Sequence, residues 1–442
     1  MNGKIYESAI NAEQFDRIRD LGVNIVLGPG EGFGTPQAEE NIVAMRLCAE
    51  RDMYFLPRDE LAREYVSAKW NGLTCAEKTA LDARFENSLR GYCEEPGFGG
   101  LLFWDEPGAT GFPGIAAAKR VFARVCPGKL FYVNMYGHCI TPEQFQGEGE
   151  PEPCFCEEPK EKRYSNFMSR YLREVEPEIY SYDLYPMVSL GGIATTVHRA
   201  LYDLPLLAKS NLRASGRNIP LWCFLQAGGR WEGSLGVRVP VQSEVLLQVN
   251  ALLALGVAGL EIFPYYFPAC WEPDREVVAG LVDVRGNPTA LYPHYRRALA
   301  SAIACQEVFT GYAYKGFFLA GKFNGLLPPE ETLKTVLWED CIYRGGIESE
   351  ENIGYFPPIL RTESTSEALV GCFEGEYPAV WVVNNSITAA ANVALFLDAP
   401  RETEIVREGV RTREVLREVR LDALEAGAAA LVVFKEKREQ RD

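Results

Sequence analysis

The chain has 442 residues, more than one ordinary hydrophobic core accommodates, so at least two domains are expected. Its hydrophobic fraction of 47% and charged fraction of 24% are typical of a globular protein. The net charge of -16 argues against nucleic acid and anionic membrane surfaces as partners, because both would repel the chain, and it favours a neutral ligand.

The 12 cysteines are dispersed, several of them inside apolar runs where a reduced thiol packs as a small hydrophobic group. The first residues lack the basic start and apolar run of an export signal, so we expect a cytoplasmic protein. Cys154 and Cys156 form one close pair, but their surroundings are rich in Pro and Glu and the chain has only 3 His. We therefore expect no metal site and no cofactor.

From the start to about residue 305, short apolar runs alternate with segments of helical spacing, which is the pattern of a parallel sheet whose strands are joined by helices. Eight runs are predicted strands, the number that closes a β/α barrel. They are 4–6, 24–27, 54–56, 100–104, 130–134, 179–182, 220–226 and 259–263, of which the first is the weakest. The acid-rich and Pro-rich segment 147–162 is expected to be a solvated loop over the barrel mouth.

A boundary is expected near 308–314, because the helical pattern stops there and short strand-like runs take over. The runs are 368–373, 379–383, 393–397, 403–406, 412–416 and 429–434, a spacing that suggests an antiparallel sandwich. We therefore predict a catalytic (β/α)8 barrel, residues 1–310, followed by a small β-sandwich, residues 311–442, that serves as a rigid accessory or as a contact in a homo-oligomer. Trp338 and Trp381 are candidate sugar platforms in it, although core packing suits Trp381 better.

Catalytic groups of such barrels sit at the carboxyl ends of the strands. The fourth predicted strand ends in Trp104-Asp105-Glu106-Pro107, where an apolar run leads directly into two acids. We interpret Glu106 as a general acid whose pKa is raised by its aromatic neighbours, and Asp105 as a group that orients Glu106 or binds a sugar hydroxyl. A surface turn is the alternative.

The sixth strand ends in Tyr182-Asp183-Leu184-Tyr185, which supplies a second carboxylate between aromatic rings suited to a sugar. A buried structural Asp is the alternative for Asp183. Polar and aromatic residues also close the fifth, seventh and eighth strands and would complete a lining for a neutral polyhydroxylated ligand. They are Asn134, Tyr136, Gln226, Glu261 and Tyr265.

The Trp104-Asp105-Glu106-Pro107 segment resembles the Asn-Glu-Pro signature of the retaining glycoside hydrolase clan of β/α barrels, which includes β-galactosidases and cellulases, with Asp in place of Asn. The resemblance implies that Glu106 is the acid/base. It also extends, through the Tyr-Asp-Leu-Tyr-Pro segment and the C-terminal runs, to uncharacterised glycosidase-like proteins that pair such a barrel with a sandwich. At the seventh strand, where the clan has its nucleophilic Glu, this chain has Gln226, and an amide cannot form a glycosyl ester.

The missing nucleophile leaves several readings open. Asp183, which we prefer, Glu261 or Glu232 could serve as the second carboxylate of an O-glycosidic hydrolase. Alternatively, the protein binds carbohydrate on a hydrolase-like barrel without cleaving it, or it is a barrel enzyme of another class, such as a lyase or isomerase.

Overall fold

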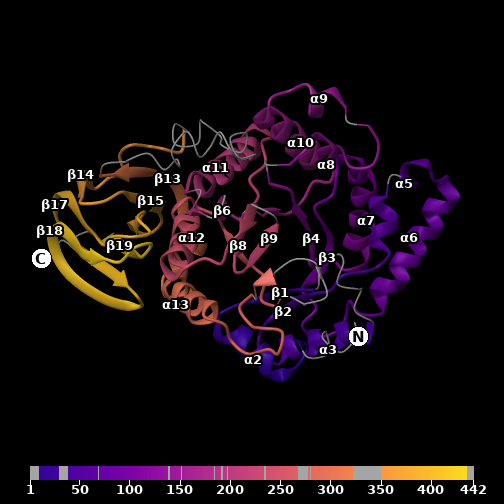
Figure 1. Ribbon diagram of the computed structural model, residues 1–442, viewed down its shortest axis with the longest axis horizontal. Helices are drawn as coiled ribbons and strands as arrows, with labels where there is room; N and C mark the ends of the chain where they lie inside the picture. The colour runs from indigo at the N-terminus through magenta and orange to yellow at the C-terminus, as the bar shows by residue number, and fades with distance from the viewer. Residues whose placement is uncertain are drawn as a thin grey trace, which may run out of the picture.

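The computed structural model describes residues 9–28, 38–67, 69–137, 140–150, 152–183, 185–190, 193–196, 198–232, 235–266, 277–278, 280–321 and 350–435. Figure 1 shows helices and parallel strands in the first part of the chain, and an antiparallel sheet formed by its C-terminal part. None of the helices in the described ranges is long and apolar enough to cross a membrane.

Seven of the eight predicted barrel strands fall in the described residues, and each of them is present. β1 pairs with β2, and a five-stranded parallel sheet has the order β11-β8-β5-β4-β3. A parallel bridge between Phe55 and Phe98 connects β2 to the chain before β3. The strands are β1 (Ile25–Leu27), β2 (Tyr54–Leu56), β3 (Gly100–Asp105), β4 (Leu130–Met135), β5 (Tyr180–Tyr182), β8 (Leu221–Gln226) and β11 (Gly259–Phe263). Within the described residues these strands form an arc, and the predicted strand 4–6 lies outside those residues, so the closed eight-stranded ring stays a prediction.

Helices alternate with these strands as the spacing predicted. Asn11 accepts a hydrogen bond from Gln14 N at 3.0 Å and so caps the first of them. The helices are α2 (Ala12–Asp20), α3 (Ala38–Ala49), α4 (Ala62–Val66), α5 (Lys69–Gly72), α6 (Cys75–Arg90), the 3-10 helix η1 (Ala109–Gly111), α7 (Phe112–Val125), α8 (Pro142–Gln146), α9 (Pro153–Cys156), α10 (Lys160–Glu174), α11 (His198–Ala214), α12 (Gln242–Ala254), α13 (Leu291–Ile303) and α14 (Gln306–Gly311).

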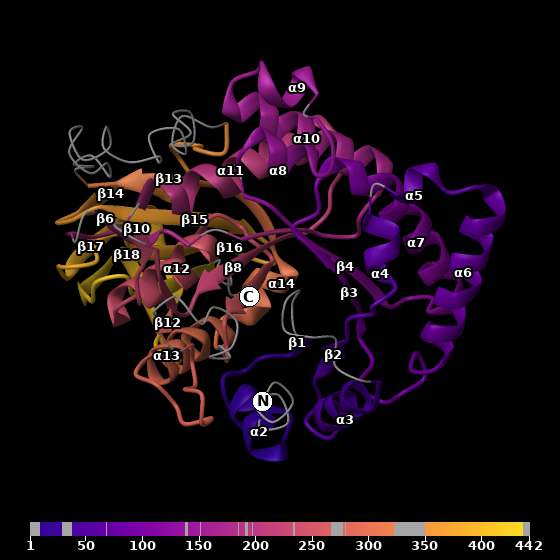
Figure 2. The same cartoon turned by 45° about the vertical axis from the view of Figure 1, so that its right-hand side comes forward.

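The first and last long helices of this region, α2 and α13, lie side by side (Figure 2). The Tyr292 hydroxyl donates to Arg17 O at 2.8 Å, and Arg296 forms an ion pair of 2.9 Å with Asp20. An inner apolar cluster, separate from the core beneath the helices, is shared by β2, β3, β4 and the residue before β5, with β1 and β8 packed against it. The strands therefore curve around a common interior.

A second, smaller sheet was not predicted. Its antiparallel strands follow the carboxyl ends of β5, β8 and β11, and its order is β12-β9-β10-β6-β7. The strands are β6 (Met187–Leu190), β7 (Ile193–Thr196), β9 (Gly229–Glu232), β10 (Leu235–Val237) and β12 (Val277–Val278). They are two to four residues long, too short for an alternating apolar pattern to reveal them.

The prediction that 147–162 is a loop is wrong in part. The segment contains α9, which begins with Pro at its first position, and α10 begins within it at Lys160. A Cβ on Gly108 would lie 2.3 Å from the Cα of Gly147, so the chain at the start of this segment packs directly against the residues that follow β3.

The C-terminal sheet has the order β13-β15-β16-β19-β17-β14, with β18 paired to β17. Its strands are β13 (Ala313–Ala320), β14 (Ile359–Ser364), β15 (Ala368–Glu374), β16 (Pro378–Asn384), β17 (Ala391–Arg407), β18 (Val410–Leu424) and β19 (Ala429–Lys435). The predicted strands 393–397 and 403–406 are two halves of β17, whose pairing shifts register between Phe396 and Arg401. The division at residue 310 stays a prediction; β13 begins at Ala313.

One face of this sheet covers its own apolar cluster, and the other packs on α12, which is buried from Glu244 to Ala254. Trp381 is fully buried there, its Nε1 donates to Asn250 O at 3.2 Å, and its ring lies 5.2 Å from that of Phe309. Core packing therefore accounts for Trp381, whereas Trp338 lies outside the described residues.

Candidate functional site

The end of β3 carries the first two acids of the candidate site. The pairing of β3 with β4 shifts between Leu102 and Trp104, and beyond the shift Asp105 lies opposite Asn134. Glu106 then adopts a left-handed backbone with φ +52, and its N–H donates to Asn134 O at 2.9 Å. Such a conformation costs a non-glycine residue about 1 kcal/mol or more, and residues held in it are concentrated at functional sites.

Asp183, which directly follows β5, meets the end of β3. Glu106 and Tyr185 lie close enough to its side chain to stabilise its carboxylate as hydrogen-bond partners. Burial and, to a lesser degree, the nearby charge of Asp105 together raise the pKa of Asp183 to about 7, against the opposing effect of Glu106 and Tyr185. A carboxyl pair in direct contact in a desolvated setting shares one proton, because two adjacent carboxylates repel each other.

Glu261 lies two residues before the carboxyl end of β11 and is only 8% exposed. Its Oε1 accepts a hydrogen bond of 2.6 Å from the Tyr132 hydroxyl, and its Oε2 accepts one of 2.7 Å from Ser181 Oγ. Burial raises the pKa of Glu261 to about 7 although both hydrogen bonds lower it. Glu261 therefore forms part of the floor of the site, with both carboxyl oxygens engaged.

A polar chain links this floor to Asp105. Ser181 Oγ lies 3.0 Å from Asn134 Oδ1, and Asn134 Nδ2 donates to Asp105 Oδ1 at 3.0 Å. Asn134 is 3% exposed, so it acts here by orienting Asp105. Neither Tyr132 nor Ser181 was predicted as a site residue, although each lies two positions before one, Asn134 and Asp183, and so shares its face of a strand.

The predicted aromatic residues fall into two groups. Trp104, Tyr136 and Tyr185 are partly exposed; the Arg58 guanidinium lies 4.9 Å from the Trp104 ring, and the Tyr185 ring lies 5.8 Å from Phe263. Tyr182 is fully buried in the main core, because neighbouring side chains on β5 point to opposite faces and Ser181 takes the inner one. In this structure Tyr182 has no surface to offer a ligand.

Two further predicted residues have other contacts. Tyr265, which follows β11, donates from its hydroxyl to Gln14 Oε1 at 2.7 Å and so is anchored to α2. Gln226 is 1% exposed, and its amide is hydrogen-bonded to the backbone of Met187 and Arg238. The structure thus brings together Asp105, Glu106, Asn134, Asp183, Tyr185 and Glu261, but leaves the Gln226 and Tyr182 side chains facing protein. The Glu232 side chain lies outside the described residues.

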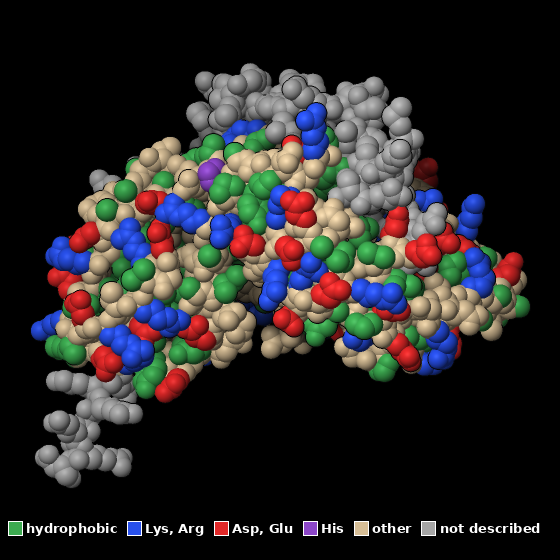
Figure 3. All heavy atoms as spheres, turned by 90° about the horizontal axis from the view of Figure 1, so that it is seen from below, with side chains coloured by type: hydrophobic (Ala, Val, Ile, Leu, Met, Phe, Trp, Pro, Cys, Tyr) green, Lys and Arg blue, Asp and Glu red, His purple; other side chains and the backbone are tan. Residues whose placement is uncertain are grey.

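Charge elsewhere on the molecule is mixed in sign. On the face seen in Figure 3, acidic and basic side chains are interspersed with apolar ones. Within the part of the chain that the structure describes, most ion pairs involve an exposed side chain, as in Arg84–Glu64 and Arg361–Glu363, and each pair of this kind stabilises the fold by less than about 1 kcal/mol.

No protein-family model and no curated protein matches the sequence. Among solved structures, the chain is similar to a family 5 glycoside hydrolase from Bacteroides vulgatus, with a TM-score of 0.50, 10% identity and coverage of 100% of this chain and 87% of that one. A noncanonic maltogenic α-amylase from Thermotoga neapolitana has a TM-score of 0.47 at 11% identity, over 96% and 94% of the two chains.

A β-galactosidase from the psychrophilic Marinomonas ef1 has a TM-score of 0.45 at 9% identity, over 67% of this chain. This chain spans 57% of the length of that enzyme. The likeness to the family 5 structure extends over the whole chain and shows one thing: the chain has a glycosidase-like fold, with parallel strands and helices followed by an antiparallel sheet.

Proposed function

We propose that the protein is a glycoside hydrolase that cleaves an O-glycosidic bond, with Glu106 as general acid and Asp183 as the second carboxylate. The observation that carries the proposal is the proximity of these two carboxyl groups, which directly follow β3 and β5 and interact closely enough for Glu106 to lower the pKa of Asp183 as a hydrogen-bond partner. The glycosidase-like fold supports the proposal, because catalytic groups of that fold lie at the carboxyl ends of the strands.

The chemistry follows from one proton shared by two carboxyl groups. With the pKa of Asp183 raised to about 7, the pair carries a proton near neutral pH that can be donated to the leaving oxygen, while the other carboxylate acts on the anomeric carbon or on water. Known pairs are about 5 Å apart in retaining enzymes and about 6.5–9.5 Å apart in inverting ones. A bound sugar must therefore separate Glu106 from Asp183 before either route operates.

A neutral carbohydrate suits the surroundings of the pair. The partly exposed rings of Trp104, Tyr136 and Tyr185 offer apolar faces for sugar rings, and Asp105 offers an acceptor for a hydroxyl. Glu261 is less suited to be the second carboxylate, because both of its oxygens already accept hydrogen bonds inside the protein.

We further propose that the parallel strands belong to a closed (β/α)8 barrel, and that the C-terminal sheet closes into a sandwich that serves as an accessory. The contact between α2 and α13 supports the first part, because helices that flank neighbouring strands of a barrel lie side by side. The register shift within β17, which marks an irregularity in the sheet, and the apolar cluster on one face of the sheet support the second.

The test is turnover of a panel of aryl glycosides and oligosaccharides, with product analysis, by the wild type and the variant Glu106→Gln. The variant is expected to lose about 100-fold to 10,000-fold in kcat with an unchanged melting temperature. Glu157 is an exposed acid that directly follows α9. The variant Glu157→Gln is the matched control and is expected to retain full activity. Unchanged turnover in Glu106→Gln would refute the role of Glu106, and binding without cleavage by the wild type would favour a carbohydrate-binding protein.

A further inference from the structure

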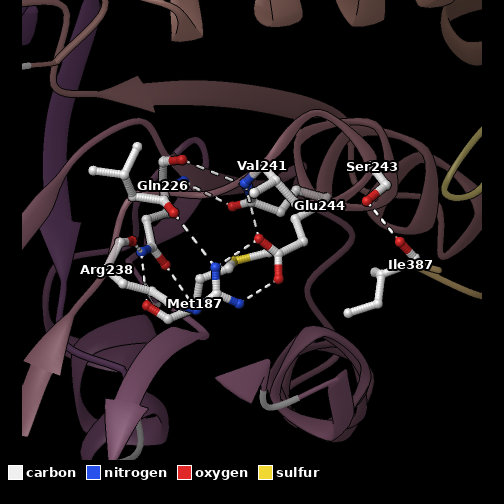
Figure 4. A network of polar contacts seen from close by, with 9 residues as sticks. Met187, Gln226, Arg238, Val241, Ser243, Glu244 and Ile387 are labelled. Atoms are coloured by element: carbon white, nitrogen blue, oxygen red, sulfur yellow. Dashed lines mark hydrogen bonds and ion pairs between the residues drawn. The ribbon is translucent and has the colours of Figure 1, made fainter. Parts of the chain in front are cut away.

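The amide of Gln226, at the end of β8, is saturated by backbone groups. Its Nε2 donates to Met187 O at 2.9 Å and to Arg238 O at 2.6 Å, while its Oε1 accepts from Met187 N at 2.9 Å (Figure 4). The side chain is 1% exposed. Both donors and the acceptor of the amide are thus used within the protein.

These bonds join three segments at one point. Met187 begins β6, four residues after Asp183, and Arg238 follows β10. β6 and β10 are antiparallel neighbours in the small sheet, and Arg238 N also donates to Met187 O at 3.0 Å. The Gln226 side chain therefore ties the end of β8 to the segment that carries Asp183 and Tyr185.

The backbone of Gln226 is itself held from two helices. Its N–H donates to Gln248 Oε1 of α12 at 2.8 Å, and its carbonyl accepts from the Tyr295 hydroxyl of α13 at 2.6 Å. Arg238 is held by an ion pair with Glu244, which is 1% exposed and also accepts from Val241 N at 2.9 Å (Figure 4). The point to which the segment with Asp183 is joined is therefore held by bonds from both helices.

The same bonds require a neutral side chain. A carboxylate in this place would face the carbonyl oxygens of Met187 and Arg238 with only Met187 N as donor, so it would lose two hydrogen bonds and gain repulsion. A Glu at position 226 is thus incompatible with this arrangement, even though the seventh strand is where the retaining clan has its nucleophile.

We propose that Gln226 is a positioning residue that holds the Asp183 segment against Glu106, and that its amide is therefore required for activity. This inference rests on the proposed function for its kinetic consequence. If Gln226 were only a lost nucleophile, Gln226→Glu would create or improve activity. A positioning role predicts instead that Gln226→Glu lowers activity.

The experiment compares Gln226→Glu and the neutral, volume-conserving Gln226→Met with the wild type in kcat, KM and pH profile. Both are expected to lose about 10-fold to 100-fold in kcat, with a smaller change in KM, because displacement of a catalytic group by about 1 Å costs that much. Gln306→Glu makes the same chemical change at an exposed position of α14 and is expected to leave both constants unchanged.

A second readout needs no substrate. The titration of the Asp183 carboxyl is followed by carbon-13 NMR, with Asp183→Asn for assignment, and its midpoint is expected to shift in folded Gln226→Met. An unshifted midpoint, or a Gln226→Glu variant as active as the wild type or more active, would overturn the positioning role. An inactive wild type whose Asp183 midpoint still moves in Gln226→Met would instead contradict the proposed function and leave the positioning role intact.

Discussion

The Tyr132 hydroxyl of β4 lies 2.6 Å from Oε1 of Glu261 of β11, although β5 and β8 stand between these strands in the sheet. Only a strongly curved sheet lets side chains of such distant strands meet, and the bond therefore records the curvature that brings the acids of the site together. The Glu261 carboxyl, whether charged or protonated, depends for its hydrogen bonds on the hydroxyl groups of Tyr132 and Ser181.

The first prediction concerns that bond. Tyr132→Phe removes one of the two donors to Glu261, which is expected to lower the free energy of unfolding by about 1–3 kcal/mol and to raise the pKa of Glu261 further. Urea unfolding at pH 7 measures the first effect. Tyr355→Phe, an exposed tyrosine, serves as the control and is expected to change the free energy little. A Tyr132→Phe protein as stable as the wild type would contradict the role assigned to the bond.

The second prediction is a pH dependence set by Asp183 and Glu261. Burial raises both pKa values to about 7, so the folded protein binds protons that the unfolded chain releases near pH 4. The stability that these groups contribute is present below pH 4, declines as the pH rises from 4, and is lost above 7. Asp183→Asn is expected to reduce the loss between pH 5 and pH 8 by about 1–2 kcal/mol, measured by urea unfolding. Asp422→Asn, an exposed acid, should retain the wild-type slope, and an equal slope in Asp183→Asn would argue against the raised pKa.

The third prediction has the opposite sign. Glu404 is buried and accepts hydrogen bonds from Lys435, Arg411 and Arg413; its pKa is lowered to about 2, because these three cations outweigh the burial that opposes them. Its contribution to stability is therefore present above pH 4.5 and is lost as the pH falls through 2.

The variant Glu404→Gln is expected to lose about 1–3 kcal/mol of unfolding free energy at pH 7, and its difference from the wild type should shrink as the pH falls from 4.5 towards 2. Glu363→Gln, which breaks the exposed pair with Arg361, is the control and should cost less than about 1 kcal/mol. A difference that stays constant with pH would contradict the lowered pKa of Glu404.

The fourth prediction concerns the contact of the C-terminal sheet with α12. A Cβ on Gly371 of β15 would lie 2.3 Å from Ala254 O, a backbone atom that cannot move aside alone. Gly371→Ala is expected to destabilise the protein by about 1–3 kcal/mol through overpacking, measured by thermal and urea unfolding. Gly72→Ala, where an added methyl meets nothing within 4 Å, is the control, and similar costs for the two variants would show that the sheet does not pack on α12 this closely.

Much of the secondary structure could be read from local sequence. The apolar runs of β3 and β4 are buried along most of their length, and such runs can be recognised in the sequence without knowledge of their tertiary contacts. The cap Asn11 is local in the same way, because its bond spans only three residues. The positions of Glu106 and Asp183 at strand ends could be predicted because each acid closely follows an apolar run.

Other features had no local signature. Gln226 resembled a polar lining residue, yet its partners Met187 and Arg238 belong to a small sheet of very short strands that no pattern revealed. Tyr182 had the same aromatic character as Tyr185, but strand alternation directs it into the core. A short motif does not show which of two neighbouring side chains faces the interior.

The sequence by itself determined the order of the main parallel strands and of the helices between them, the change to antiparallel strands after α14, and the two acids that follow β3 and β5, because each depends on contacts between near neighbours along the chain. Only the tertiary structure decided that Glu261 meets Tyr132, 129 residues away, and that Gln226 binds backbone instead of facing a ligand. These outcomes depend on how strongly the sheet curves and on which segments pack across its carboxyl ends, and both result from the packing of the whole chain.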